Sequence, residues 1–82
     1  MMRTNAGLPN YAAECAMKCA DPAFKRFLWE HHGFDISDRE RIACQIREFL
    51  DVESRSDLNA DQLAADRWLS MRASFEAWMI VA

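Results

Sequence analysis

The last third of the chain shows the strongest hydrophobic pattern. Between Asn59 and Ala82, apolar residues recur at intervals of three or four, which places them along one stripe of an α-helix. Asn59 and Gln62 have the spacing of a capping box, and Leu58 and Leu63 have that of a hydrophobic staple. We therefore predict one long helix over Asn59–Ala82 as the spine of the fold. Its stripe consists of Ala64, Trp68, Met71, Phe75, Trp78 and Ala82.

Two short helices are predicted in the first part of the chain. Residues 1–8 show no periodicity, and we expect a flexible arm there. Pro9 and Asn10 open the first helix, and Asp21 and Pro22 suit the N-cap and first position of the second. The inner side of the first carries Tyr11, Cys15 and Cys19, and the second buries Phe24, Phe27, Leu28 and His31 before Gly33 ends it.

A third helix follows the capping box that Ser37 and Glu40 form with Asp38 and Arg39. Its buried face is expected to contain Ile42, Ile46, Phe49 and Leu50. Farther along the chain, the spacing of Ser54 and Asp57 predicts a single capped turn. No segment alternates between apolar and polar residues over the length of a strand. The pattern predicts an all-α fold, a compact bundle of three short helices packed on one long C-terminal helix, in a single domain over residues 1–82.

Composition narrows the function classes. The 82 residues are 51% apolar, which favours a folded domain with one core. The net charge is −3, and residues 51–82 hold six acids against three bases, whereas residues 1–50 hold seven of each. This balance argues against a surface that follows a phosphate backbone. An odd cysteine count without a signal peptide or apolar span predicts a cytoplasmic protein.

Chemistry-bearing motifs are sparse. Cys15 and Cys19 lie one helical turn apart, and Cys44, His31 or His32 would complete a zinc set. This spacing is not that of a familiar zinc module, and we favour packing for the thiols, with no metal and no cofactor. Of the two histidines, one is expected to face inward and the other to lie near the carbonyl end of its helix. Without a phosphate-binding glycine loop or a Ser-His-Asp pattern, we predict no enzyme.

Two charged sets could instead serve recognition. A solvated helix start accounts for the acids of the last third, but they could also form a ridge offered to a basic protein groove. An exposed Trp29 or Tyr11 would then act as an interface anchor. Four arginines could alternatively form a nucleic-acid-binding surface. The acids interleaved with them favour an exposed face with internal ion pairs instead. The acids are Asp51, Glu53, Asp57, Asp61 and Asp66, and the arginines are Arg39, Arg41, Arg47 and Arg55.

Three segments together resemble small all-helical accessory proteins of phage and prophage early regions, near recombination or counter-defence genes. These segments are Asp21-Pro22-Ala23-Phe24 with Phe27-Leu28, the turn Ser54–Asn59, and the aromatics Trp68, Phe75 and Trp78. The resemblance implies a phage-linked setting and a non-enzymatic, partner-binding role, and it transfers no catalytic residue.

Three hypotheses follow. The first is an interaction module that binds a protein of host or phage nucleic-acid machinery, in its concrete version an inhibitor of a CRISPR effector. The second is a nucleic-acid-binding accessory factor in phage recombination or transcription control. The third is a homodimer that buries Trp78 to Val81 between its subunits.

Overall fold

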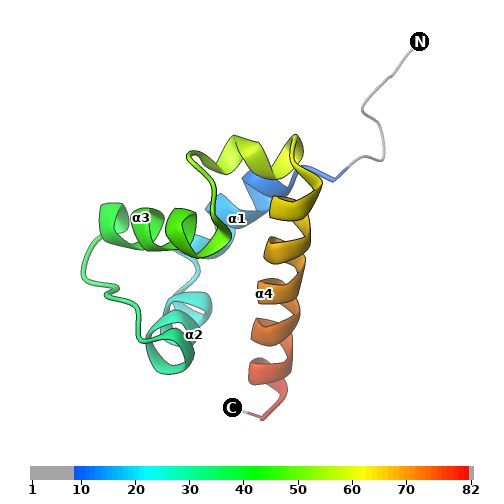
Figure 1. The fold of residues 1–82 in the computed structure, drawn as a ribbon. Coiled ribbons are helices and arrows are strands. Elements are labelled where there is room, and N and C mark those ends of the chain that lie inside the picture. The colour runs from blue at the N-terminus through cyan, green and yellow to red at the C-terminus, as the bar shows by residue number, and fades with distance from the viewer. Residues whose placement is uncertain (1–8, 82) are drawn as a thin grey trace.

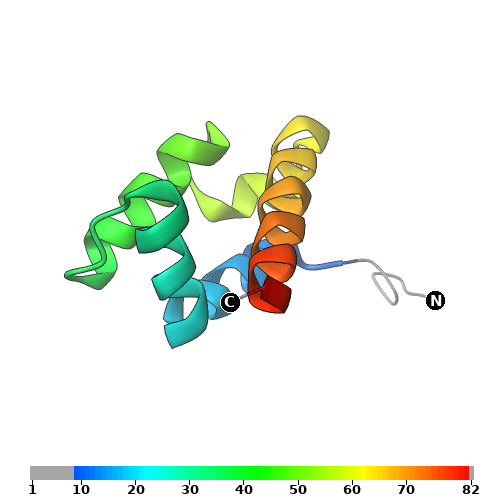
Figure 2. The same ribbon diagram turned by 90° about the horizontal axis from the view of Figure 1, so that it is seen from below.

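The computed structural model describes residues 9–81, which fold into an all-α bundle (Figure 1). Within the described residues no strand forms, and the shorter helices lie to one side of the long C-terminal helix in both views (Figures 1 and 2). This confirms the predicted fold class. The arm predicted over residues 1–8 and the stripe residue Ala82 lie outside the described residues. The elements are α1 (Tyr11–Ala20), α2 (Pro22–His32), α3 (Arg39–Leu50), the 3-10 helix η1 (Arg55–Asn59) and α4 (Gln62–Val81).

The first two helices begin and end at the predicted residues. The Asn10 side chain accepts a hydrogen bond from the Ala13 amide at 3.1 Å and caps α1. The Asp21 carboxylate accepts one from the Ala23 amide at 2.9 Å and caps α2. Gly33 ends α2 with φ 69°, a left-handed conformation that glycine adopts without steric penalty. Local sequence therefore sets these boundaries.

The boundaries of α3 differ from the prediction by one residue. Asp38, not Ser37, is the N-cap, because its carboxylate accepts from the Arg41 amide at 2.9 Å. The Ser37 amide instead donates to Asp35 at 2.9 Å. At the other end, Asp51 takes a left-handed conformation with φ 58°, which turns the chain sharply toward η1.

The predicted start of α4 at Asn59 is wrong. Asn59 ends η1, and its side chain accepts from the Ala12 amide at 3.1 Å and donates to Asn10 at 2.9 Å. The helix begins at Gln62 instead, where Asp61 accepts from the Leu63 amide at 3.0 Å. Leu63 is 64% exposed, so no hydrophobic staple forms. The predicted capped turn over Ser54 to Asp57 is confirmed as the start of η1.

Aromatic rings on α2 and α4 form the centre of the core. The Phe24 ring meets those of Trp68 and Phe75 edge to face, at centroid distances of 5.9 and 5.0 Å. Trp68, Met71 and Phe75 are buried as the stripe predicts, and burial of each large apolar side chain contributes roughly 1.5–3 kcal/mol. Further buried residues are Cys15, Cys19, Phe27, Leu28, Ile42, Ala43, Ile46, Leu50, Leu58, Ala64 and Ala65.

Candidate functional site

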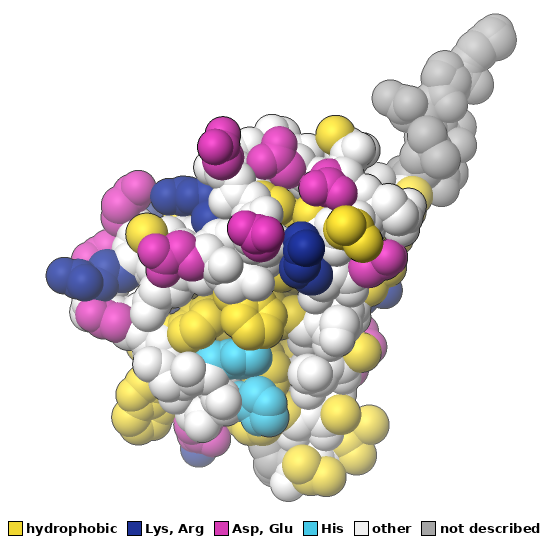
Figure 3. Space-filling view, in the orientation of Figure 1, with side chains coloured by type: hydrophobic (Ala, Val, Ile, Leu, Met, Phe, Trp, Pro, Cys, Tyr) yellow, Lys and Arg dark blue, Asp and Glu magenta, His cyan; other side chains and the backbone are white. Residues whose placement is uncertain are grey.

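A hollow of about 560 Å³ lies where the end of α3 meets the start of α4. Five carboxylates and one arginine line it, and we call it the acidic hollow. Figure 3 shows acidic side chains gathered at this end of the molecule. The grouped carboxylates give this hollow a negative local potential, which Arg47 offsets only in part. The lining residues are Arg47, Glu48, Asp51, Val52, Glu53, Asp57 and Asp61.

Tight turns bring these carboxylates together. Asp57 accepts hydrogen bonds from the amides of Glu53 at 3.1 Å and Ser54 at 3.3 Å, and Asp61 caps α4. Part of the acidic character therefore has a structural role. Among residues 9–81, the hydrogen bonds and ion pairs do not involve the side chains of Glu48, Asp51 or Glu53. These three carboxylates are available to a partner.

Phe49 follows Glu48, a lining residue of the acidic hollow, in the last turn of α3. Its side chain is 46% exposed, so the prediction that it is buried is wrong. The buried face of α3 consists of Ile42, Ile46 and Leu50, which are spaced four residues apart. Phe49 precedes Leu50, so its side chain points away from that face. Its ring packs edge to face on His32 at 4.9 Å.

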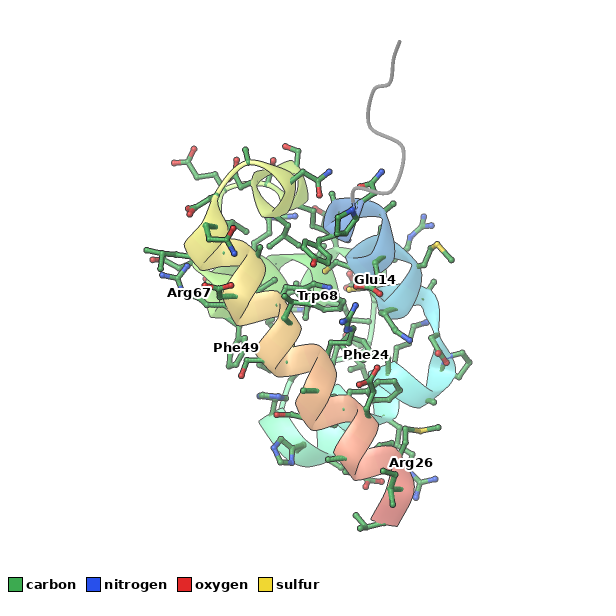
Figure 4. All side chains as sticks on the ribbon, turned by 90° about the vertical axis from the view of Figure 1, so that its right-hand side faces the viewer. Glu14, Phe24, Arg26, Phe49, Arg67 and Trp68 are labelled. Carbon is green, nitrogen blue, oxygen red and sulfur yellow. The ribbon has the colours of Figure 1, made fainter. Side chains whose placement is uncertain are left out.

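Arg67 connects α4 to this end of α3. Its guanidinium donates to the Leu50 carbonyl at 3.1 Å, which satisfies one of the unpaired carbonyls at the helix end. In Figure 4, Arg67 and Phe49 lie on the same side of α4. Below the acids, Figure 3 shows hydrophobic side chains and the histidines on the same face. Acidic and hydrophobic side chains therefore share one surface.

The histidines exchange the roles expected for them. His31, predicted to be buried, is exposed and stacks on Phe27 at 5.1 Å, whereas His32 is half-buried and faces inward. Rings of Phe27, Phe34 and Phe49 surround His32. Burial, and secondly the charge of His31, lower the pKa of His32 below its usual 6.5. Among the described side chains, its Nε2 is buried without a hydrogen-bond partner. A neutral His32 is therefore favoured beneath Phe49.

Two of the predicted partner-binding residues lie apart from the acidic hollow. Asp66 is exposed on α4 and accepts from Gln62 at 2.9 Å. Trp29 is 60% exposed on α2, and neither residue lines the hollow. Tyr11 is half-buried at the start of α1. Glu48, which was not among the predicted partner-binding residues, lines the hollow, and only the exact rotation of α3 could have revealed this.

The four arginines are spread over three surfaces. Arg41 pairs with Asp35 at 3.4 Å and approaches Asp38 at 4.0 Å. Arg47 lines the acidic hollow, and Arg39 and Arg55 line a separate hollow beside α1. The described residues therefore present no continuous arginine stripe of the kind that follows a phosphate backbone.

The zinc set considered from the sequence does not come together. Cys15 and Cys19 are buried on α1, while Cys44 is exposed on α3. Across residues 9–81, no three side chains of His, Cys, Asp or Glu are grouped as a metal ion requires. Cys15 and Cys19 both belong to the hydrophobic core.

Comparison with known proteins finds no matching protein family, no matching curated protein and no matching solved structure. None of the helices in the described part of the chain is long and apolar enough to cross a membrane.

Proposed function

We propose that this protein is a non-enzymatic interaction module that binds a basic protein surface. The observation that carries the proposal is the exposed aromatic ring of Phe49, which follows Glu48 in the chain, at the end of α3 where free carboxylates line the acidic hollow. An aromatic anchor surrounded by charged groups is a common arrangement at protein interfaces.

Each part of this surface has a separate role in recognition. The carboxylates of Glu48, Asp51 and Glu53 attract basic side chains over a distance and orient the approaching partner. The Phe49 ring then loses its contact with water, and burial of its exposed area holds the complex together. Charge therefore mainly affects the association rate, and the ring mainly affects the dissociation rate.

The partner class follows from the charge. Protein surfaces rich in Lys and Arg are typical of nucleic-acid-binding proteins, because phosphate contacts dominate their affinity. An acidic face can occupy such a groove in place of nucleic acid. Together with the resemblance to phage accessory proteins, this supports a protein of the nucleic-acid machinery as the partner, and a CRISPR effector as the first one to test.

The test compares variants of two surfaces. Phe49→Ser with Glu53→Lys alters the proposed face, and Trp29→Ser with Glu76→Lys alters exposed residues elsewhere. We expect wild type and the second variant to bind a purified CRISPR effector and reduce interference in cells, and the first variant to lose both effects. Binding that persists in the first variant, or that is lost only in the second, would contradict the proposed face.

Direct nucleic-acid binding is tested in parallel. Arg39 and Arg55 share a hollow that excludes Arg41 and Arg47, so we expect no salt-sensitive shift of DNA or RNA by the isolated chain. A shift that disappears when Arg39 and Arg55 become alanine would support the accessory-factor alternative instead.

A further inference from the structure

Helix α1 carries two buried thiols one helical turn apart. Cys15 is fully buried, and Cys19 is 5% exposed where it forms part of the wall of a second hollow of about 410 Å³. Two arginines from other elements, Arg39 of α3 and Arg55 of η1, line this hollow with one carboxylate, Glu40. We call it the thiol hollow; its remaining lining residues are Ala16, Ala20 and Ala43.

The pKa of the Cys19 thiol lies below its usual range. Its pKa is lowered by the hydrogen bond from the Cys15 thiol and by the positive charges of Arg55 and Lys25, while burial acts in the opposite direction. The pKa of Cys15 is raised, first because of its hydrogen bond to Cys19 and then because of burial. The thiolate is the nucleophilic form of cysteine, and a lowered pKa favours it at Cys19.

Cys44 provides a contrast within the same chain. It is exposed on α3, in a depression lined by three carboxylates, Asp38, Glu40 and Glu48, and by the cation Arg41. An anionic reagent is disfavoured there by the local charge, although access is easier than at Cys19. The two sites therefore differ in both exposure and sign of charge.

We propose that Cys19 is a thiol–disulfide exchange site for small anionic disulfides of the glutathione class, held in the thiol hollow by Arg39 and Arg55. Carboxylates of such a molecule match the two guanidinium groups, and Glu40 faces its ammonium group. The Cys19 thiolate attacks one sulfur of the disulfide and forms a new S–S bond. The original S–S bond breaks, and the second half leaves as a thiolate that takes a proton from water.

This exchange balances without another oxidant, since one thiol is oxidised while half of the small disulfide is reduced. The adduct would lie between α1, α3 and η1, where α1 contacts each of the other two. Modification would therefore loosen the packing of α1, and reduction would restore it. The inference is independent of the partner proposed for Phe49.

The test uses the whole chain and two reagents of opposite charge. Folded protein is treated with glutathione disulfide or with the dication cystamine, and adducts are located by peptide mass spectrometry over time. We expect glutathione disulfide to modify Cys19 before Cys44, and cystamine to reverse that order. Arg55→Gln should slow the glutathione adduct at Cys19 by roughly fivefold or more, while Arg55→Lys keeps most of the rate.

Two results would overturn the proposal. One is modification of Cys44 first by both reagents, and the other is modification of Cys19 only at urea concentrations that unfold the chain. The reagent comparison needs no variant, so it decides the matter even where a substitution at Arg55 disturbs the fold. Circular dichroism of each variant separates slower exchange from lost structure.

Discussion

The Glu14 carboxylate on α1 accepts a hydrogen bond from the indole nitrogen of Trp68 on α4, at 2.7 Å, although 54 residues separate them. The same carboxylate pairs with Arg72, whose Nη1 lies 2.9 Å from both oxygens. Figure 4 shows Glu14 and Trp68 facing each other between the two helices. Because Trp68 is fully buried, this contact satisfies the one polar atom of the largest core side chain.

Glu14→Ala should lower the free energy of unfolding by about 1–3 kcal/mol, because it leaves the buried indole N–H without an acceptor. The ion pair with Arg72 adds little, since both side chains are about one-third exposed, at 34% and 32%. Glu14→Gln keeps an acceptor and should be less destabilising. Urea unfolding followed by tryptophan fluorescence measures all three chains.

The matched control is Glu30→Ala, which removes the exposed pair between Glu30 and Arg26. We expect no resolvable change in the midpoint of unfolding for this variant. Equal destabilisation by Glu14→Ala and Glu30→Ala would mean that the Glu14–Trp68 contact does not stabilise the packing of α1 on α4.

His32 predicts a loss of stability at mildly acidic pH. Its pKa in the folded chain lies below the ordinary 6.5, first because of burial and then because of the His31 charge. As pH falls through this window, the unfolded chain binds a proton that the folded chain does not, so the free energy of unfolding decreases. Above about pH 7.5, His32 is neutral in both the folded and the unfolded chain, so its contribution to the free energy of unfolding no longer changes with pH.

Urea unfolding at pH 7.5 and 5.5 measures the effect, and His32→Phe should remove much of the difference. His31→Gln should retain most of it, because burial is the larger cause at His32. An NMR titration that places the His32 pKa at or above 6.5 would contradict the account.

Gly33→Ala tests the left-handed end of α2. A Cβ at this position meets nothing within 4 Å, so the variant changes only the backbone preference at φ 69°. We expect a loss of about 1–2 kcal/mol in the free energy of unfolding, since L-residues disfavour this region. Thermal unfolding measures it, and an unchanged melting temperature would show that α2 ends in another conformation.

Asp51→Gly tests the equivalent left-handed position at the end of α3, where we expect the substitution to raise the free energy of unfolding. Asp51 holds φ 58° beside the other carboxylates of the acidic hollow. Glycine relieves the backbone strain and removes one like charge, so we expect a gain of about 0.5–1 kcal/mol. The same variant should bind the proposed partner more weakly, which separates a stabilising change from a functional one. A destabilised Asp51→Gly would contradict this account of the turn.

Interactions within a few residues made much of this fold predictable. Asn10, Asp21 and Gly33 act where their types and spacing indicate, and Trp68 and Phe75 are buried as the helical stripe requires. Asn59 failed as a predicted cap because its partners, Asn10 and Ala12, lie 49 and 47 residues away. No local pattern contains that information.

The candidate site was less predictable for a related reason. Asp51, Glu53, Asp57 and Asp61 could be selected as acids, but only the turns at Asp51 and Ser54 place them around one hollow. Phe49 is exposed because α3 is oriented so that Leu50, and not Phe49, faces the core. A periodicity that tolerates intervals of three or four cannot distinguish Phe49 from Leu50 as the buried neighbour of Ile46.

The most direct measurement is photocrosslinking from the proposed face in lysate of a host cell. A p-benzoylphenylalanine replaces Phe49 in one chain and Trp29 in another, and the adducts are identified by mass spectrometry. We expect the probe at Phe49 to capture a nucleic-acid-binding protein, and we expect this adduct to be lost in high salt or with Glu53→Lys. Capture from Trp29 alone, or an adduct at Phe49 that neither salt nor Glu53→Lys changes, would contradict it.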